Sequence, residues 1–361
     1  MPRPPREGWS YGSHLAHSLL YVMPWERRYV FELGMELRGE IRQYAWMLKP
    51  DVAIITGIGC EHHRAIGTLE DIRYEKLQAI QRMAPGNVAV LNGDDPAVRW
   101  MAPQTRARVL FYGFGEENQV RASDFHSDGP QGSRFLLHVD GATHKVSTRL
   151  LGRHMSYAVL AALAAAYAED IDLEQAIERI SRVAPTHQRM EPVWLPNGAC
   201  LICDDYKAAL ETMEPAVRFL GELHATRRIV VIGDMGDFPG KWRPTYRQMG
   251  ALIAENADMM LIIGLNNQAY ASGAAAAGMP RANIIKCRGN VRIAFEWLRD
   301  NLHENDVVLI KGRFKQRLDR IAMALQGRRV GCWVENCPCQ FLTCQECPML
   351  ERGWPDGTVV C

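Results

Sequence analysis

The feature that most constrains this chain is a regular alternation of short apolar runs with stretches of helical periodicity. Each run is rich in β-branched residues and has the length of a buried strand. In the second half the predicted strands span 199–203, 228–232, 259–263 and 306–310, and the predicted helices between them span 210–223, 246–255 and 291–301. Strands that alternate with helices form βαβ units, so the pattern predicts a largely parallel sheet.

The first half carries a shorter version of the same pattern. A strand is predicted at 51–58 (DVAIITGI), a helix at 68–83 and a second strand at 87–91. Short alternating strands with glycine turns between 106 and 148 indicate a small antiparallel section. Two further helices are predicted at 155–168 and 173–182.

These patterns predict an α/β fold in two domains with a tail. We place the domain boundary near 185–188, where the alternation restarts. The first part, 1–185, is expected to hold a parallel sheet with the antiparallel section. The second part, 186–330, is expected to be a Rossmann-like α/β domain, and the tail, 331–361, is rich in cysteine.

Charge and hydropathy limit the kinds of partner. A formal net charge of +1 gives no strong positive field, which argues against a general nucleic-acid or membrane-surface binder. The longest apolar run, 158–168, is too short to span a bilayer, and residues 1–6 lead into no secretory signal. We expect a cytoplasmic protein without nucleic-acid or membrane partners.

Polar side chains follow the predicted strands, at the edge of an open α/β sheet where ligands bind. They are Glu32 (after the strand-like YVF), Thr56, His62, Asn92, Asp204, Asp205, Asp234 and Lys311. Mg²⁺ takes one or two carboxylates together with phosphate oxygens, and lysine brings a mobile positive charge. Any one of these residues alone could be a helix cap or a turn residue, but the ordered set favours a magnesium–phosphate site.

The stretches that hold these residues resemble the Mur ligases, most closely the branch that adds D-Ala-D-Ala to the UDP-muramoyl tripeptide. Residues 31–76 resemble the central domain of that family nearly throughout, and NGDDP (92–96) and LGRH (151–154) continue the match. In the second domain the matching motifs are HQRMEPV (187–193), CDDYKAALETM (203–213), GDMGDF (233–238) and KGRFKQRLD (311–319).

The resemblance implies a role for each matched residue. Glu32 falls on a magnesium-binding glutamate, His62 on a histidine of the second metal, and Lys76 on a lysine that is carbamylated in many members. With Lys76 and His62, Arg189 completes the implied catalytic set. The implied nucleotide-site residues are Asn92, Arg189 and Asp204, and the implied substrate-site residues are Lys207, Asp234 and Lys311.

The chemistry implied by the resemblance is amide formation driven by ATP and Mg²⁺. A substrate carboxylate is phosphorylated to an acyl phosphate, and the amine of an amino acid or peptide then attacks it. Metal ions and cationic side chains offset the charge of the transferring group, and domain closure brings the amine to the acyl carbon.

The chain departs from the family pattern in two ways. A P-loop needs G-x-x-x-x-G-K-[ST], but the only Gly-Lys pair, at 240–241, is followed by Trp242 and preceded by no glycine at position 235. The asparagines that face adenine in the family are here Met155 and Ala158, YNANP has become YKAAL (206–210), and the serine of the KGS motif is Arg313.

These departures leave three functions open. The chain could be a ligase that needs a P-loop from an upstream segment or from a partner subunit, and it would join a carboxylate substrate to an amine substrate. It could instead be a non-catalytic Mur-like protein that binds a ligase or a peptide. A third alternative keeps the ligase chemistry but joins a different acid and amine.

Cysteine usage is uneven along the chain. Five tail cysteines, Cys332, Cys337, Cys339, Cys344 and Cys347, favour a metal site that holds Zn²⁺ or, second, an iron–sulfur cluster. A redox or disulfide function and an unstructured tail are the alternatives. We expect Cys60, Cys200, Cys203 and Cys287 to be small buried apolar side chains.

Overall fold

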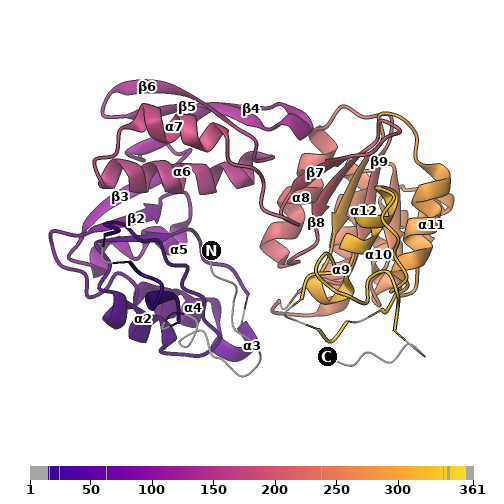
Figure 1. The fold of residues 1–361 in the computed structure, drawn as a ribbon, viewed down its shortest axis with the longest axis horizontal. Helices are drawn as coiled ribbons and strands as arrows, with labels where there is room; N and C mark the ends of the chain where they lie inside the picture. The colour runs from indigo at the N-terminus through magenta and orange to yellow at the C-terminus, as the bar shows by residue number, and fades with distance from the viewer. Residues whose placement is uncertain are drawn as a thin grey trace. The chain divides into compact units, whose positions relative to one another are not determined.

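The structure, a computed structural model, describes residues 15, 17–23, 25–61, 63–236, 238–335, 337–339 and 342–354. These residues form two compact units. The N-terminal unit comprises 1–126, 134–148 and 155–182, and the C-terminal unit comprises 127–133, 149–154 and 183–361 (Figure 1). The main division therefore lies a few residues before the predicted boundary. No described helix is long and apolar enough to cross a bilayer.

The N-terminal unit is built on a six-stranded sheet in the order β1-β2-β3-β4-β5-β6. Its strands are β1 Val52–Ile55, β2 Val88–Asn92, β3 Arg108–Gly113, β4 Val120–Ser127, β5 Ser133–Val139 and β6 Ala142–Thr148. Its helices are α2 Glu40–Leu48, α3 His63–Ile66, α4 Leu69–Leu77, α5 Pro96–Arg99, α6 Arg153–Ala168 and α7 Leu173–Ser181. Strands β1 to β4 pair in parallel, which confirms the parallel sheet predicted for this half. The antiparallel section predicted at 106–148 is wrong for β3, which pairs in parallel with both β2 and β4.

One predicted strand of this unit is wrong. The YVF stretch before Glu32 lies in a segment, 26–35, that forms neither helix nor strand. Val30 is 91% exposed, whereas Phe31 and Leu33 pack against the cluster around Ile41 and Tyr44. Side-chain packing, rather than a hydrogen-bonded ladder, therefore holds the segment in place.

The C-terminal unit is a second six-stranded sheet, in the order β11-β10-β9-β12-β8-β7. Its strands are β7 Glu191–Trp194, β8 Cys200–Asp204, β9 Arg228–Ile232, β10 Met259–Ile262, β11 Ile284–Lys286 and β12 Val307–Lys311. Its helices are α8 Leu210–Glu222, α9 Trp242–Asn256, α10 Asn267–Ala276, α11 Val291–Asn301 and α12 Asp319–Leu325. All pairs are parallel except the one between β7 and β8, as predicted for a Rossmann-like domain.

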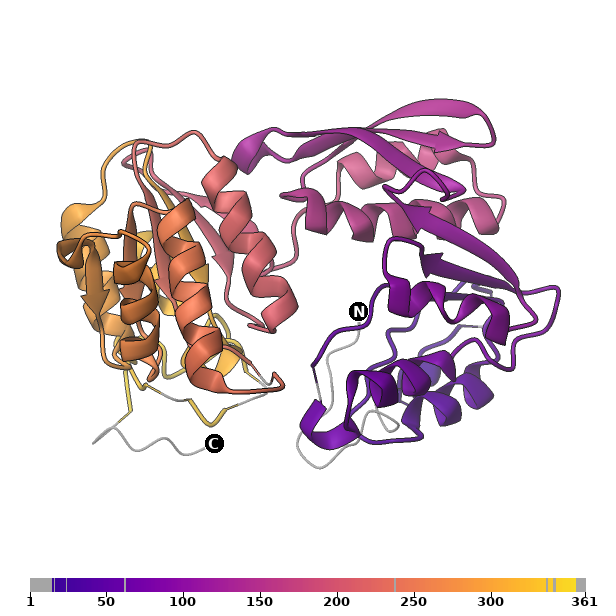
Figure 2. The ribbon, with the colours of Figure 1, turned by 180° about the vertical axis from the view of Figure 1, so that it is seen from behind.

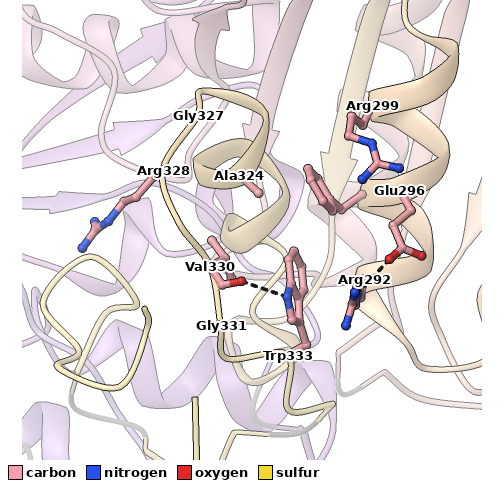
Figure 3. A pocket seen from close by; sticks show the side chains of 10 residues that line it. Arg292, Glu296, Arg299, Ala324, Gly327, Arg328, Val330, Gly331 and Trp333 are labelled. Carbon is pink, nitrogen blue, oxygen red and sulfur yellow. Dashed lines mark hydrogen bonds and ion pairs between the residues drawn. The ribbon is translucent and has the colours of Figure 1, made fainter. Parts of the chain in front are cut away.

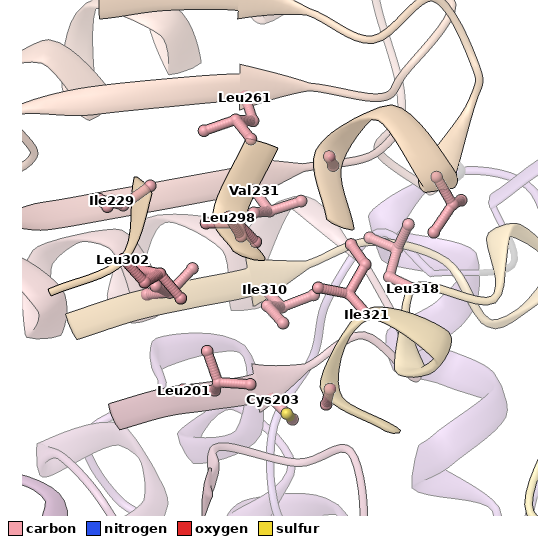
Figure 4. Packing of buried hydrophobic residues seen from close by; sticks show 14 of the residues in the cluster. Leu201, Cys203, Ile229, Val231, Leu261, Leu298, Leu302, Ile310, Leu318 and Ile321 are labelled. Atoms are coloured by element: carbon pink, nitrogen blue, oxygen red, sulfur yellow. The ribbon is translucent and has the colours of Figure 1, made fainter. Parts of the chain in front are cut away.

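Helices cover both faces of this sheet (Figures 1 and 2). Alternate residues of β8, β9 and β12, such as Leu201, Val231 and Ile310, point to one face and meet α11 and α12 through Leu298 and Ile321 (Figure 4). Because both faces are covered, the central strands are apolar throughout and their polar residues fall at the strand ends. The layering therefore places Asp204, Asp234 and Lys311 at or just after the carboxyl ends of their strands.

Candidate functional site

In the N-terminal unit, two predicted site residues converge on the loop that follows β1. Asn92, at the end of β2, donates its side-chain Nδ2 to the Thr56 carbonyl at 3.0 Å. Lys76, on α4, donates Nζ to the Gly57 carbonyl at 2.8 Å. The structure thus brings Lys76 and Asn92 to consecutive residues at the carboxyl end of β1, where parallel sheets bind ligands.

Helix α4 is oriented by a capping box at its start. The Thr68 side chain accepts from the Asp71 backbone N–H, and the Asp71 carboxylate accepts from the Thr68 backbone N–H at 2.8 Å. Reciprocal caps of this kind satisfy N–H groups that have no partner within the helix. Starting the helix at this point places Lys76 in its last turn, where its side chain reaches the β1 loop.

Within its described part, the structure does not bring the two predicted magnesium ligands together. Glu32 is exposed in the irregular segment, and His62 lies outside the described residues. Within the part of the chain that the structure describes, no three His, Cys, Asp or Glu side chains are arranged to hold a metal ion. Glu32 and His62 therefore remain predicted ligands.

In the C-terminal unit, Asp204 and Lys311 form a buried ion pair. They are partners in the register of β8 and β12, and Lys311 Nζ lies 2.6 Å from Asp204 Oδ2. Nζ also donates to the Lys207 carbonyl at 2.9 Å and to Thr212 Oγ1 at 3.2 Å, so its three protons are all engaged. Burial lowers the pKa of Lys311 and raises the pKa of Asp204, although each charge offsets the shift of the other.

Arg189 begins a ladder of four side chains beside this pair, which contact one another through their rings and guanidinium groups. Its guanidinium carbon lies 4.8 Å from the centre of the Tyr206 ring, and that ring lies 5.3 Å from the Phe314 ring. The Arg317 guanidinium covers the other end, 3.8 Å from the Phe314 centre. The ladder holds Arg189, a predicted phosphate contact, next to the ends of β8 and β12.

Asp234 links the loops that follow three strands. Its carboxylate accepts from the Leu265 backbone N–H at 3.2 Å, from Asn266 Nδ2 at 3.4 Å and from Gln316 Nε2 at 3.4 Å. Gln316 Oε1 in turn accepts from the Asp234 backbone N–H at 3.0 Å. Asp234, predicted to contact substrate, is thereby fixed at the carboxyl edge of β9, between the ends of β10 and β12.

The sequence placed Asp205 only among the polar residues that follow strands, and it gave Asp319 and His154 no role in the site. Burial, together with the nearby Asp319, raises the pKa of Asp205 to about 8, and burial also raises the pKa of Asp319. Burial and then Lys311 lower the pKa of His154 to about 4. The CDDYK motif contains Asp205 as a second acid, but no local sequence pattern predicts that this side chain is buried, with only 1% of it exposed.

The described part of the tail packs against the C-terminal unit. Arg320 donates Nη1 to the Val334 carbonyl at 2.8 Å and Nε to Cys344 Sγ at 3.3 Å. The Cys337 backbone N–H donates to the Lys315 carbonyl at 3.1 Å. The alternative of an unstructured tail is therefore wrong for the described residues.

The nine cysteines among the described residues divide by environment. Cys60, Cys200, Cys203 and Cys287 are all buried, which confirms the prediction that they are small buried side chains. In the tail, Cys332, Cys337 and Cys344 are buried free thiols, Cys347 is a half-buried one, and Cys339 is in a disulfide. No three of the described ones are arranged as metal ligands, so the zinc or iron–sulfur site stays a prediction.

Comparisons with known proteins match most of the chain to one protein family. The family model "Mur ligase middle domain" matches residues 14–166, and "Mur ligase, glutamate ligase domain" matches 188–314. The UDP-N-acetylmuramoyl-tripeptide--D-alanyl-D-alanine ligase of Bacillus subtilis (strain 168) is 26% identical over 299 residues, and that of Treponema pallidum (strain Nichols) is 28% identical over 325. The matches cover 82% and 87% of this chain but 64% and 66% of those relatives.

Solved structures show the same fold. MurF from Acinetobacter baumannii aligns with a TM-score of 0.76 at 20% identity, covering 87% of this chain and 68% of that one. MurF ligase from Thermotoga maritima, in complex with ADP, aligns with a TM-score of 0.68 at 18% identity, covering 81% and 65%. The chain thus spans about two thirds of the length of the proteins it matches.

Proposed function

The chain belongs to the Mur ligase family, and from this premise we propose that it takes part in ATP-dependent amide formation. The carboxylate of one substrate attacks the γ-phosphate of ATP, ADP leaves, and an acyl phosphate forms. The amine of a second substrate then attacks the acyl carbon, and inorganic phosphate leaves. Peptide-like substrates are proposed because the relatives named above join D-alanyl-D-alanine to a tripeptide.

The observation that carries this proposal is the convergence of Lys76 and Asn92 on the loop after β1. In the mechanism, Asn92 fixes the loop against the end of β2, and Lys76 holds the same loop from α4. When bound, Mg²⁺ would be held by Glu32 and His62 and would offset the charge on the transferring phosphoryl group. In the C-terminal unit, Arg189 would contact phosphate while the stacked Tyr206 keeps it in place.

We further propose that a P-loop joins the N-terminal unit at the open edge of β1, from an upstream segment or a partner subunit. β1 is the last strand of the described sheet, and its apolar Ile54 is 38% exposed. A parallel strand added there would end beside Thr56 and Gly57. Its following loop would then lie where Lys76 and Asn92 already meet, as phosphate-binding loops do in βαβ sheets.

Calorimetry with a non-hydrolysable ATP analogue and Mg²⁺ tests the proposal. The chain is titrated alone and together with a P-loop-bearing segment or partner, and phosphate release is then followed with ATP and candidate substrates. We expect binding in the completed protein that Lys76→Ala abolishes or weakens, whereas Lys315→Ala, an exposed lysine of the C-terminal unit, leaves binding unchanged. Absence of both binding and phosphate release in the completed protein would contradict the proposal.

A second candidate is a non-catalytic Mur-like protein that binds a ligase or a peptide. It is favoured by Lys311, whose three protons are engaged within the chain, and by the loss of the adenine-facing asparagines at 155 and 158. Tight binding to a full-length Mur ligase without any ATP turnover would favour this candidate, and turnover in the completed protein would exclude it.

We also propose that the cysteine-rich tail binds a metal ion. Four described tail cysteines are free thiols and provide enough ligands for a tetrahedral ion. Metal analysis of the purified protein tests the idea, because one equivalent of zinc or iron that disappears in a Cys344→Ser, Cys347→Ser double variant would support it. The idea would be refuted if the purified protein contained no metal and were as stable as protein treated with zinc or iron.

A further inference from the structure

A hollow of about 290 Å³ lies in the C-terminal unit, and none of its lining residues belongs to the predicted ligase site or to the predicted tail metal site, although Cys332 lies between two of them. One wall is a single face of α11, made by Arg292, Phe295, Glu296 and Arg299 at positions i, i+3, i+4 and i+7. The opposite wall is made by Ala324, near the end of α12, and by the segment that follows this helix, with Gly327, Arg328, Val330, Gly331 and Trp333 (Figure 3). The family match ends at residue 314, so the second wall lies outside the matched part of the chain.

The hollow has a fixed aromatic wall. The Trp333 indole stacks on Phe295 with ring centres 5.3 Å apart and an interplanar angle of 23°. Its Nε1 donates to the Val330 carbonyl at 3.1 Å. The backbone beside it is also held, because the N–H groups of Gly331 and Cys332 both donate to the Leu350 carbonyl, at 2.7 and 2.9 Å. The hollow is therefore bounded by ordered side chains and backbone.

The rim of the hollow is rich in arginine. Arg292 binds Glu296 through Nε alone, at 2.8 Å, and Arg299 binds Asp300 through Nε and Nη2. Arg328 is directed away from Trp333 (Figure 3). The carboxylates in these pairs are 40% and 58% exposed, and exposed ion pairs contribute only about 0–1 kcal/mol. A ligand anion can therefore displace them at little cost and bind the terminal guanidinium nitrogens.

We propose that this hollow binds a small organic anion that carries a phosphate or carboxylate group on a flat ring. Arg292 and Arg299 bind the anionic group, because a guanidinium presents paired donors that match phosphate and carboxylate oxygens. The Trp333 indole contacts the ring by stacking. The site is separate from the proposed ligase chemistry, since none of its residues belongs to the sets implied for nucleotide, metal or substrate.

Titration calorimetry of the full chain with phenyl phosphate tests the proposal, with benzoate and inorganic phosphate as companion probes. We expect phenyl phosphate to bind more tightly than inorganic phosphate, because only the former has a ring for Trp333. An Arg292→Gln, Arg299→Gln double variant should weaken binding by at least about tenfold. Benzoate binding shows whether the site also accepts carboxylates.

The matched control is an Arg243→Gln, Arg247→Gln double variant, which removes two arginines that line a different hollow, on α9. That variant should bind phenyl phosphate like the unmodified chain, and thermal unfolding should show both double variants to be folded. Trp333→Phe should retain most of the affinity for phenyl phosphate, whereas Trp333→Leu should reduce it towards that for inorganic phosphate. The proposal fails if phenyl phosphate does not bind at millimolar concentrations, or if the Arg292/Arg299 variant binds it unchanged.

Discussion

At the scale of single residues, the C-terminal unit concentrates buried charge at the ends of β8 and β12. Asp204, Asp205, Lys311 and Asp319 are each at most 5% exposed. A buried charge loses its hydration, and a partner with good geometry must offset that cost. Asp204 and Lys311 are paired at 2.6 Å, whereas a carboxylate oxygen of Asp205 and both of Asp319 have no hydrogen-bond partner among the described residues. The two kinds of acid should therefore respond differently to mutation.

Lys311→Met should destabilise the C-terminal unit by about 3–5 kcal/mol, because it leaves Asp204 buried and without its counter-charge. Chemical denaturation followed by circular dichroism measures the loss. Lys315→Met, at an exposed position four residues along the chain, is the matched control and should change the free energy of unfolding by about 0.5 kcal/mol or less. Equal effects of the two substitutions would show that the ion pair is not needed for stability.

Asp205 should make stability fall as pH rises. Burial raises its pKa to about 8, against 3.8 for the exposed side chain. Between those values the folded chain keeps a proton that the unfolded chain has lost, so the folded state is favoured at the acidic end and loses that advantage as pH approaches 8. Asp205→Asn does not titrate and keeps an oxygen that can accept from Gln188, which now donates at 3.0 Å.

The measurement for Asp205 is the difference in free energy of unfolding between the Asp205→Asn variant and the unmodified chain at several pH values. We expect this difference to grow in favour of the variant between about pH 5 and 8. Using a difference cancels the titration of groups that the two chains share. A difference that stays constant over this range would mean that Asp205 titrates at its ordinary pKa in the folded chain.

At the scale of elements, β1 combines two properties that rarely occur together. Its sequence, VAII, is apolar on both faces, as in a central parallel strand, yet it is the end strand of the described sheet. Unpaired N–H and C=O groups on such an edge are a template for a further strand. The exposed side chain of Ile54 adds an apolar contact on the same strand.

Ile54→Lys should reduce self-association of the chain without lowering its stability. A lysine on an edge strand opposes the pairing of a further strand, and the replaced side chain is already 38% exposed. Light scattering over a range of protein concentration measures association. Leu69→Lys replaces a side chain that is 48% exposed on α4 and serves as the control. If both substitutions reduced association equally, general hydrophobicity rather than the β1 edge would be the cause.

At the scale of the whole molecule, the chain has two units with separate cores. The core of the N-terminal unit includes Leu91 and the residues of β2 around it. The core of the C-terminal unit lies around β9 and β12. Units that each have their own core can unfold separately, so one free energy of unfolding need not describe this chain.

Denaturation should therefore show two transitions, each sensitive to a different core. Leu91→Ala, in β2, should lower the stability of one transition by about 2–5 kcal/mol, and Leu309→Ala, in β12, should lower the other by a similar amount. Both leucines are fully buried. Tryptophan fluorescence and circular dichroism recorded on the same samples separate the transitions. A single transition lowered equally by both variants would mean that the units unfold together.

The elements that sequence could not predict depend on close contacts with other elements. Helix α10 (Asn267–Ala276) is rich in alanine and shows no clear division into apolar and polar faces. Its Gly273 packs so tightly on α9 that an added Cβ would lie 1.9 Å from the Arg247 carbonyl oxygen. Helix α10 thus packs on α9 through a backbone approach that no local periodicity reveals.

The sequence by itself determined the order of most strands and helices, because apolar runs and helical periodicity are local patterns, but it did not predict α10. It also determined which polar residues follow which strand, and so placed Asn92, Asp204 and Lys311 at the carboxyl ends of parallel strands. Only the tertiary structure decided what those residues contact. Lys311 meets Asp204 across 107 positions of sequence, and its burial and three bonds depend on β8 and β12 being neighbours. Burial and pairing are properties of the packed fold, so charge and hydrogen-bond state could not be derived from sequence spacing alone.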